Sequence, residues 1–173
     1  MADTMTPLQR HHCMSSIHSR DTRPELVVRR CLWRHGFRYR LCDKTLPGRP
    51  DIVLRKWNTV IFVNGCFWHG HDCGAFRLPR TNSDFWRAKI ARNRQRDSAS
   101  AARLQRLGFN VITVWECELK PAVMHKTLES LVVTLSRIVL EQTSTAPTLE
   151  SSYGAPTTSA AIAAEPIEPY GTK

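Results

Sequence analysis

The chain has 173 residues and a mass of 19.8 kDa, which allows one domain with a sizeable core but not two full domains. Its 25 Lys and Arg residues outnumber its 15 Asp and Glu residues, and the net charge of +10 is typical of proteins that bind a polyanion. No apolar run is long enough to span a bilayer, and residues 1–20 lack the apolar core of a secretory signal. We therefore expect a cytoplasmic protein with no membrane partner.

The positive charge belongs to the first part of the chain. Residues 1–141 hold 24 basic and 12 acidic side chains, whereas residues 142–173 hold one Lys and three Glu. Ser, Thr, Pro and Ala dominate this last segment, which cannot bury enough apolar surface to offset the entropy cost of ordering. We therefore predict a folded domain over residues 1–141 and a disordered tail over residues 142–173.

Two helices are predicted near the N-terminus. Residues 7–20 favour a short, mostly polar helix. A clearer helix follows, because Thr22 can cap it, Pro24 suits its first turn and Glu25 completes a Thr-x-x-Glu capping box. Gly36 can end this second helix.

Four short strands are predicted after these helices. Apolar and basic residues alternate over residues 37–41, which is typical of a strand. Residues 51–54 and 59–63 are β-branched runs joined by four residues, so we expect them to pair as antiparallel neighbours. Residues 111–115 are a further apolar run, which we interpret as a buried strand.

Two long helices complete the expected fold. Ser83 is predicted to cap a basic helix over residues 84–107, which Gly108 ends. Pro121 is predicted to open the last helix, whose apolar residues recur at four- and three-residue spacing and should pack on the core. This order of elements predicts an α/β or α+β domain.

The cysteines indicate a metal site rather than a disulfide framework. Without a secretory signal we expect a reducing compartment, where clustered cysteines typically bind metal. A structural zinc takes four nitrogen or sulfur ligands from a local cluster and a second segment. Cys66, Cys73, Cys117 and one histidine would complete such a site, and the sequence pattern leaves both His69 and His71 open as the fourth ligand.

Two acidic residues are candidates for a catalytic metal site. Asp51 directly precedes a predicted strand, and a carboxylate at the end of a short β-pair can present a hard divalent cation to a phosphate. The alternative is a turn aspartate that binds local backbone amides. Glu25 could supply a second carboxylate, although its place in the capping box is a sufficient structural reason for its presence.

Aromatic and basic side chains are interleaved over residues 67–106 of the predicted domain. Phe67, Trp68 and Trp86 either belong to the core or act as a wedge between base pairs. The predicted helix that contains Trp86 carries more positive charge than a solvated face requires, which favours phosphate binding. Its basic residues are Arg87, Lys89, Arg92, Arg94, Arg96, Arg103 and Arg106.

Four motifs together resemble the very short patch repair (Vsr) endonuclease family. They are Leu-Pro-Gly-Arg-Pro-Asp at 46–51, Gly-Cys-Phe-Trp-His at 65–69, His-x-Cys at 71–73 and Val-Trp-Glu-Cys at 114–117. The motifs occur in register and in order, and the likeness covers about residues 8–120. The predicted tail has no part in it.

The resemblance implies both a fold and an activity. The fold would be of the type II restriction-endonuclease kind, with a mixed central sheet, flanking helices and a structural zinc. The activity would be nicking of the thymine strand, on its 5′ side, at T:G mismatches left by deamination of 5-methylcytosine. We expect a nucleoid-associated monomer in the bacterial cytoplasm that acts on double-stranded DNA, with mismatch-repair proteins as candidate partners.

The resemblance also implies roles for individual residues. Asp51 and the backbone carbonyl of Val63 would bind the catalytic Mg²⁺, His69 would activate water, and Glu25 would assist from its helix. The zinc ligands would be Cys66, His71, Cys73 and Cys117. DNA contacts would come from the N-terminal helix, the aromatic wedge and the basic helix. The expected contact residues are Met14, Ile17, Phe67, Trp68, Trp86, Lys89 and Arg92.

Asn64 departs from the family pattern, which has a second active-site histidine at this place. An asparagine can hold a water by hydrogen bonding but cannot take up a proton. Two alternatives to the mismatch nickase therefore stay open. One is a zinc-stabilised DNA-binding module that does not cut, and the other is a site-specific restriction-type endonuclease.

Overall fold

The computed structural model describes residues 6–15, 20–74 and 76–144. An N-terminal pair of helices is followed by three strands, a long helix, a fourth strand and a last helix. The elements are α1 (Pro7–Ser15), α2 (Arg23–Arg34), β1 (Arg40–Leu41), β2 (Ile52–Leu54), η1 (Arg55–Trp57), β3 (Thr59–Asn64), α3 (Ser83–Arg106), β4 (Asn110–Trp115), η2 (Glu116–Leu119) and α4 (Met124–Ser144).

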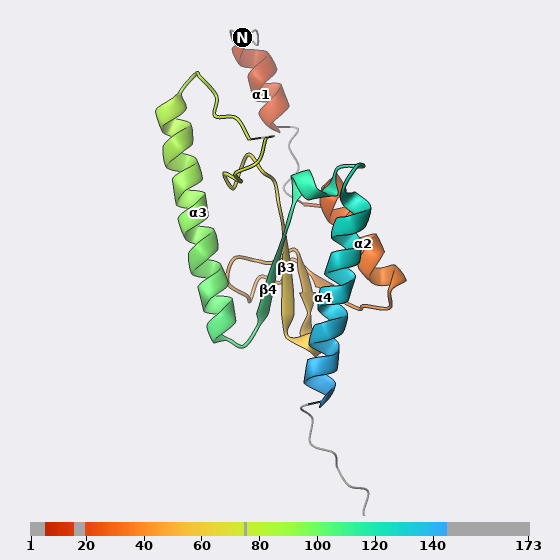
Figure 1. The fold of residues 1–173 in the computed structure, drawn as a ribbon. Helices are drawn as coiled ribbons and strands as arrows, with labels where there is room; N and C mark the ends of the chain where they lie inside the picture. Colours follow the sequence, from red (N-terminus) through yellow and green to blue (C-terminus); the bar gives the residue numbers. More distant parts are fainter. Residues whose placement is uncertain (1–5, 16–19, 75, 145–173) are drawn as a thin grey trace, which may run out of the picture.

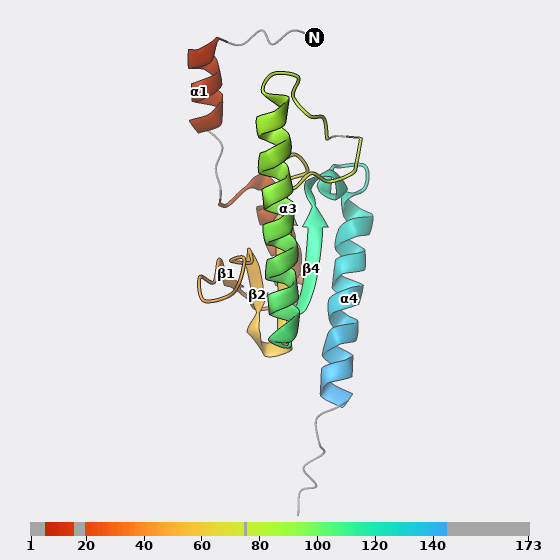
Figure 2. The same ribbon diagram turned by 90° about the vertical axis from the view of Figure 1, so that its left-hand side faces the viewer.

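A mixed sheet forms the centre of the fold. Its strand order is β1-β2-β3-β4, in which β1 to β3 pair antiparallel and β4 pairs parallel to β3. The sheet lies between α3 on one side and α2 with α4 on the other, and α1 stands outside these layers (Figures 1 and 2). The predicted α/β architecture with a central sheet and flanking helices is confirmed.

Both faces of the sheet are covered, which explains why its central strands are continuously apolar. Ile52, Leu54 and Ile61 share a core cluster with residues of α2 and α4. The alternate residues Val53 and Val60 form a second cluster with Leu46 of the preceding loop and Leu104 of α3. This alternation follows the two-residue period of a strand.

Local signals place α2 and the antiparallel pair as predicted. Thr22 caps α2 by accepting the Glu25 N–H, and Gly36 follows the helix with a φ of 82°, a conformation that glycine adopts without strain. Between β2 and β3, the predicted four-residue connection contains the single turn η1 and ends at Asn58.

Several element ends differ from the predictions. Ser83 is the first residue of α3 rather than its cap, and the cap position belongs to Asn82, which is left-handed and makes no side-chain cap bond. Pro121 does not open the last helix, because the Met124 N–H bonds to the Lys120 carbonyl in a turn and α4 begins at Met124.

Two strands are also less regular than predicted. Of residues 37–41 only Arg40 and Leu41 pair with β2, and Phe37 is buried in the core instead. In β4 only Val114 is buried, because the strand lies at the edge of the sheet.

The end of α4 passes the boundary predicted at residue 141. The helix continues to Ser144, and the Gln142 side-chain amide donates a hydrogen bond to the Trp57 carbonyl at 3.0 Å. Residues 145–173 of the predicted tail and residues 16–19 of the predicted N-terminal helix lie outside the described residues. Within the part of the chain that the structure describes, no helix has both the length and the apolar character needed to cross a membrane.

Candidate active site and metal centre

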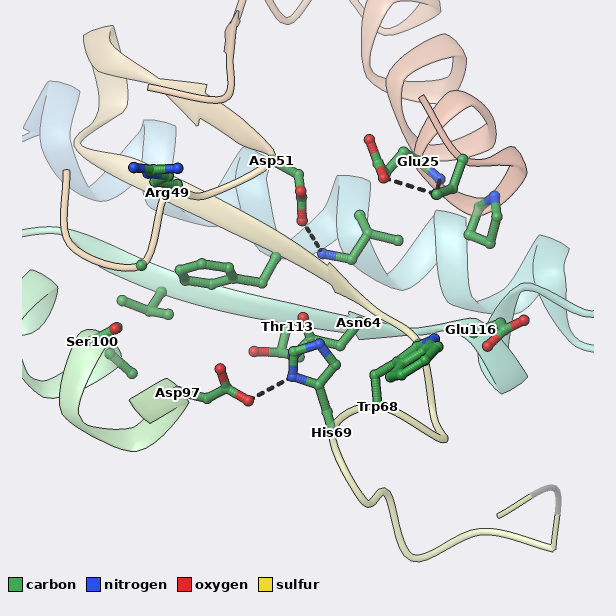
Figure 3. Close-up of a pocket in the computed structure, with 18 of the residues that line it drawn as sticks. Glu25, Arg49, Asp51, Asn64, Trp68, His69, Asp97, Ser100, Thr113 and Glu116 are labelled. Carbon is green, nitrogen blue, oxygen red and sulfur yellow. Dashed lines mark hydrogen bonds and ion pairs between the residues drawn. The ribbon is translucent and has the colours of Figure 1, made fainter. Parts of the chain in front are cut away.

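One edge of the sheet gathers the candidate catalytic residues. β3 and β4 run parallel and end side by side at Asn64 and Trp115, and Asp51 directly precedes the antiparallel β2 at the same edge. A cavity of about 870 Å³ opens here (Figure 3). Its lining includes every residue for which a catalytic or Mg²⁺-binding role was expected, namely Glu25, Asp51, Val63, Asn64 and His69.

Asp51 is held against β3. Its Oδ2 accepts a hydrogen bond from the Val63 backbone N–H at 2.8 Å. Burial raises the pKa of the Asp51 carboxyl, the Val63 N–H opposes this rise, and the negative charge of Glu25 adds to it. A half-buried carboxylate with an acidic neighbour is an environment that a divalent cation would stabilise, so the residues fit a hard cation with oxygen ligands.

His69 has a partner that the sequence did not reveal. Its Nδ1 lies 2.5 Å from Oδ2 of Asp97, which reaches the cavity from α3 (Figure 3). A carboxylate at Nδ1 fixes the imidazole ring and leaves Nε2 as the nitrogen that can exchange a proton.

The sequence contains a spacing signal for Asp97. Asn93 lies one helical turn before Asp97, and its side-chain amide donates to the Trp68 carbonyl at 2.8 Å. Two polar residues four apart on a helix share one face, and this face of α3 fixes the loop that contains His69. The contact itself depends on how α3 packs across the sheet, which no local pattern states.

Glu25 is both a capping residue and part of the cavity wall. The side chain is buried, and its Oε1 accepts a hydrogen bond from the Thr22 hydroxyl at 2.8 Å. Its Oε2 accepts one from Arg29 at 2.6 Å. The structural role expected from the capping box therefore coexists with a position at the cavity.

The second centre joins the loop after β3 to the turn after β4. The ligand atoms of Cys66, His71, Cys73 and Cys117 all lie within 4.8 Å of one another. His71 Nδ1 is 3.7 Å from Cys66 Sγ and 3.4 Å from Cys117 Sγ. A tetrahedral zinc with bonds of about 2.0–2.3 Å separates its ligand atoms by about 3.3–3.8 Å, so this donor set fits zinc.

The strand register brings these ligands together. Asn64 pairs with Trp115, and Cys66 and Cys117 each follow by two residues. The His71 ring stacks on Trp115 with centroids 4.0 Å apart and an interplanar angle of 5°. Burial raises the pKa of Cys66 to about 12, so a bound cation is needed to hold this sulfur as a thiolate.

The three candidate wedge residues lie in one aromatic cluster. The Phe67 ring is 5.1 Å from those of both Trp68 and Trp86, centroid to centroid. All three are half-buried, so they pack on one another and still present surface. The Lys89 ammonium lies 5.6 Å from the Trp68 ring centroid and 5.4 Å from that of Trp86. Cation–π contacts of this kind add cohesion to the cluster.

The remaining expected DNA contacts are less closely associated with the cavity. Arg92 is exposed on α3. Met14 belongs to α1, outside the layers of the fold, and Ile17 lies outside the described residues.

The chain is similar to known DNA-nicking proteins. The sequence model of one family, described as DNA mismatch endonuclease Vsr, matches residues 2–75. A type II nicking enzyme of Neisseria meningitidis serogroup A is 48% identical over 133 residues, which are 76% of this chain and 95% of the relative. A similar enzyme of Xanthomonas oryzae is 46% identical over 119 residues, 69% of this chain and 88% of the relative. The DNA mismatch endonuclease Vsr of Escherichia coli K12 is 43% identical over 120 residues, 69% of this chain and 77% of the relative.

Proposed function

Because the chain belongs to the Vsr family of DNA mismatch endonucleases, we propose that it nicks the thymine strand on the 5′ side of T:G mismatches left by 5-methylcytosine deamination. It is a DNA mismatch nicking endonuclease, a hydrolase whose substrate is DNA. We propose a preference for T:G over other pairs and a dependence on Mg²⁺. We further propose that the sheet and its helices form a type II restriction-endonuclease-like fold.

The observation that carries the proposal is the pairing of two chemical functions in one cavity. Asp51 offers a carboxylate suited to a hard cation, and the His69–Asp97 pair offers a positioned base. Hydrolysis of a phosphodiester needs both a charge that stabilises the phosphorane-like transition state and a group that takes the proton of water. A DNA-binding module without cleavage would need neither.

The residues divide the reaction between them. Mg²⁺ bound by Asp51 and the Val63 carbonyl would polarise the scissile phosphate and neutralise its developing charge. His69 takes a proton from the attacking water through Nε2, and Asp97 stabilises the imidazolium that forms. Asn64 lines the same cavity and can orient water by hydrogen bonding, but it cannot accept the proton.

Zinc would stabilise the frame of this cavity. Held by Cys66, His71, Cys73 and Cys117, the ion would tie the loop that contains His69 to the end of β4. A structural zinc of this kind has no open coordination position, so it would take no part in the cutting step.

Mismatch recognition would use the aromatic cluster. Phe67, Trp68 and Trp86 would enter the duplex beside the wobble pair, which costs less to unstack than a matched pair. Trp68 and His69 are adjacent in the chain. Insertion of the Trp68 ring would therefore place the His69 imidazole, the general base, at a defined distance from the mismatch. Lys89, Arg92, Met14 of the N-terminal helix and Ile17 would add contacts to the DNA.

The test is nicking of end-labelled duplexes that differ only in the central pair. A T:G duplex and Mg²⁺ should give one cut, 5′ of the thymine, and a C:G duplex or omission of Mg²⁺ should give none. Cutting of both strands of a matched duplex would favour the restriction-type alternative. Binding of the T:G duplex without any cut at any Mg²⁺ concentration would favour the binding module.

A further inference from the structure

Arg29 is a buried cation to which the mechanism above gives no role. It lies on α2, is 6% exposed and follows Glu25 by one helical turn. One terminal nitrogen donates to Glu25 Oε2 at 2.6 Å, and the other donates to Asp21. Arg29 therefore joins a carboxylate on the cavity wall to the residue that leads the chain into α2.

The Glu25 carboxylate has little freedom left. Oε1 accepts from the Thr22 hydroxyl at 2.8 Å, and Oε2 accepts from the Asp21 backbone N–H at 3.1 Å as well as from Arg29. An ionised carboxylate offers about four lone-pair sites, of which three are thus occupied. Glu25 can present the cavity with its charge in one fixed orientation.

Fold stability alone does not account for a cation at this position. Val28 and Leu32, on the same helix, are fully buried in the core, and Arg29 is nearly as buried as these two apolar residues. Among the described residues, its buried Nε has no hydrogen-bond partner. A buried ion pair gains little over an apolar replacement, and an unsatisfied donor adds a cost.

The charges of Glu25 and Arg29 affect the pKa of Asp51. Burial raises the pKa of the Asp51 carboxyl, Glu25 adds to the rise, and the positive charge of Arg29 opposes it. Arg29 does not line the cavity, and its hydrogen bonds go to Glu25, which does, and to Asp21.

We propose that Arg29 is a positioning residue for the nicking reaction, because its guanidinium fork clamps Glu25 to Asp21 and so fixes the Glu25 carboxylate on the cavity wall beside Asp51. The inference rests on the proposed function, in which this cavity binds Mg²⁺. Arginine is required because its planar fork can hold two carboxylates in one geometry, whereas the ammonium of lysine is a single point charge.

A double-substitution cycle tests this role by single-turnover nicking of a T:G duplex. Arg29→Lys keeps the charge and should lower the rate about tenfold. Arg30→Lys, at an exposed neighbouring position on α2, should change it less than about twofold. In the Glu25→Gln variant, adding Arg29→Lys should lower the nicking rate by a further factor of less than about two, because the group through which Arg29 acts is gone.

Calorimetric titration of the DNA-free protein with Mg²⁺ gives a second readout. Arg29→Lys and Glu25→Gln should weaken Mg²⁺ binding by similar factors, and Arg30→Lys should not. A normal rate for either Arg29→Lys or Glu25→Gln, or losses that multiply in the double variant, would overturn the proposal. Failure of the unsubstituted protein to nick would refute the proposed function instead, and the calorimetry would then decide the role of Arg29.

Discussion

His69 and Asp97 lie 2.5 Å apart although 28 positions separate them in the chain. If Asp97 orients the ring and stabilises its protonated form, Asp97→Asn should lower the single-turnover nicking rate about 10²-fold, the lower end of what a general base contributes. Asp84→Asn is the matched control, because that side chain is exposed near the start of the same helix. DNA affinity measured without Mg²⁺ should not change in either variant.

A rate for Asp97→Asn within about threefold of the unsubstituted rate would mean that the contact only fastens the loop to α3.

A second prediction concerns stability and compares two aspartates of opposite environment. Burial raises the pKa of Asp51, whereas hydrogen bonds from Thr45 and Arg55 lower that of Asp43 to about 2. A raised acid pKa means that the ionised form costs stability at neutral pH, and this cost disappears as the pH falls below the unfolded value. For Asp43 the sign is reversed, since its contribution is present above the unfolded value and is lost as the pH falls toward 2.

Asp51→Asn should therefore raise the melting temperature at pH 7 without added Mg²⁺, and it should abolish nicking at Mg²⁺ concentrations that suffice for the unsubstituted protein. Asp43→Asn should lower the melting temperature and leave nicking intact. Thermal melts of both variants at pH 7 and pH 4 would show it. The Asp51→Asn difference should shrink at pH 4, whereas most of the Asp43→Asn difference should remain there and be lost only as the pH falls toward 2. If Asp51→Asn instead melts earlier at pH 7, the carboxylate contributes to stability and the idea of a strained cation site is wrong.

At the scale of elements, the Cys/His cluster brings together residues of the loop after β3 and of the turn after β4. Structural zinc can contribute on the order of 10 kcal/mol to folding. Cys117→Ala should therefore lose bound zinc, lower the melting temperature strongly and abolish nicking. Cys31→Ala, on α2 and outside the cluster, should keep all three properties. Elemental analysis of the purified proteins is the direct check, and unsubstituted protein without zinc would end this account.

The aromatic cluster should affect discrimination between T:G and matched duplexes more than the nicking rate on a T:G duplex. Trp68→Ala should reduce the preference for T:G over matched duplex, because stacking on a base is worth about 1–3 kcal/mol. Trp33→Ala is a control on the exposed part of α2. Arg92→Ala should weaken binding to both duplexes alike and flatten the salt dependence. Equal losses on both duplexes for Trp68→Ala would assign this ring to the core.

For the molecule as a whole, the sequence predicted what local chemistry controls. The cap of α2, the antiparallel β2–β3 pair and the cysteines of the Cys/His cluster follow from motifs in the sequence. The residue pattern left His69 and His71 open as the fourth member, and the family resemblance pointed to His71. Asp97 was missed because its contact with His69 depends on how α3 packs across the sheet. Arg29 was missed although Glu25 lies one turn before it, because a Glu–Arg pair at this spacing is also typical of a solvated helix face. The starts of the last two long helices differ from the predictions, because Asn82 takes the cap position of α3 without a side-chain bond and a turn from Lys120 to Met124 separates Pro121 from α4.

The extent of the folded unit is also testable. We propose that the nuclease domain ends with α4, whose last turn is tied to Trp57 through Gln142. A chain ending at Ser144 should nick as fast as the full chain. A chain ending at Glu141 loses this hydrogen bond and should be less stable by about 1 kcal/mol. A full chain that is much more active than the Ser144 truncation would give residues 145–173 a role in the reaction.

The most direct test of the account is single-turnover nicking of a T:G duplex over a Mg²⁺ series, with the unsubstituted protein, Asp51→Asn and His69→Ala. If Asp51 holds the cation and His69 is the base, raising Mg²⁺ should restore part of the Asp51→Asn rate. The His69→Ala rate should stay lower by at least about 10²-fold at every Mg²⁺ concentration, with normal binding of the duplex. Near-normal nicking by His69→Ala, or recovery of both variants at the same Mg²⁺ concentration, would contradict this division of roles.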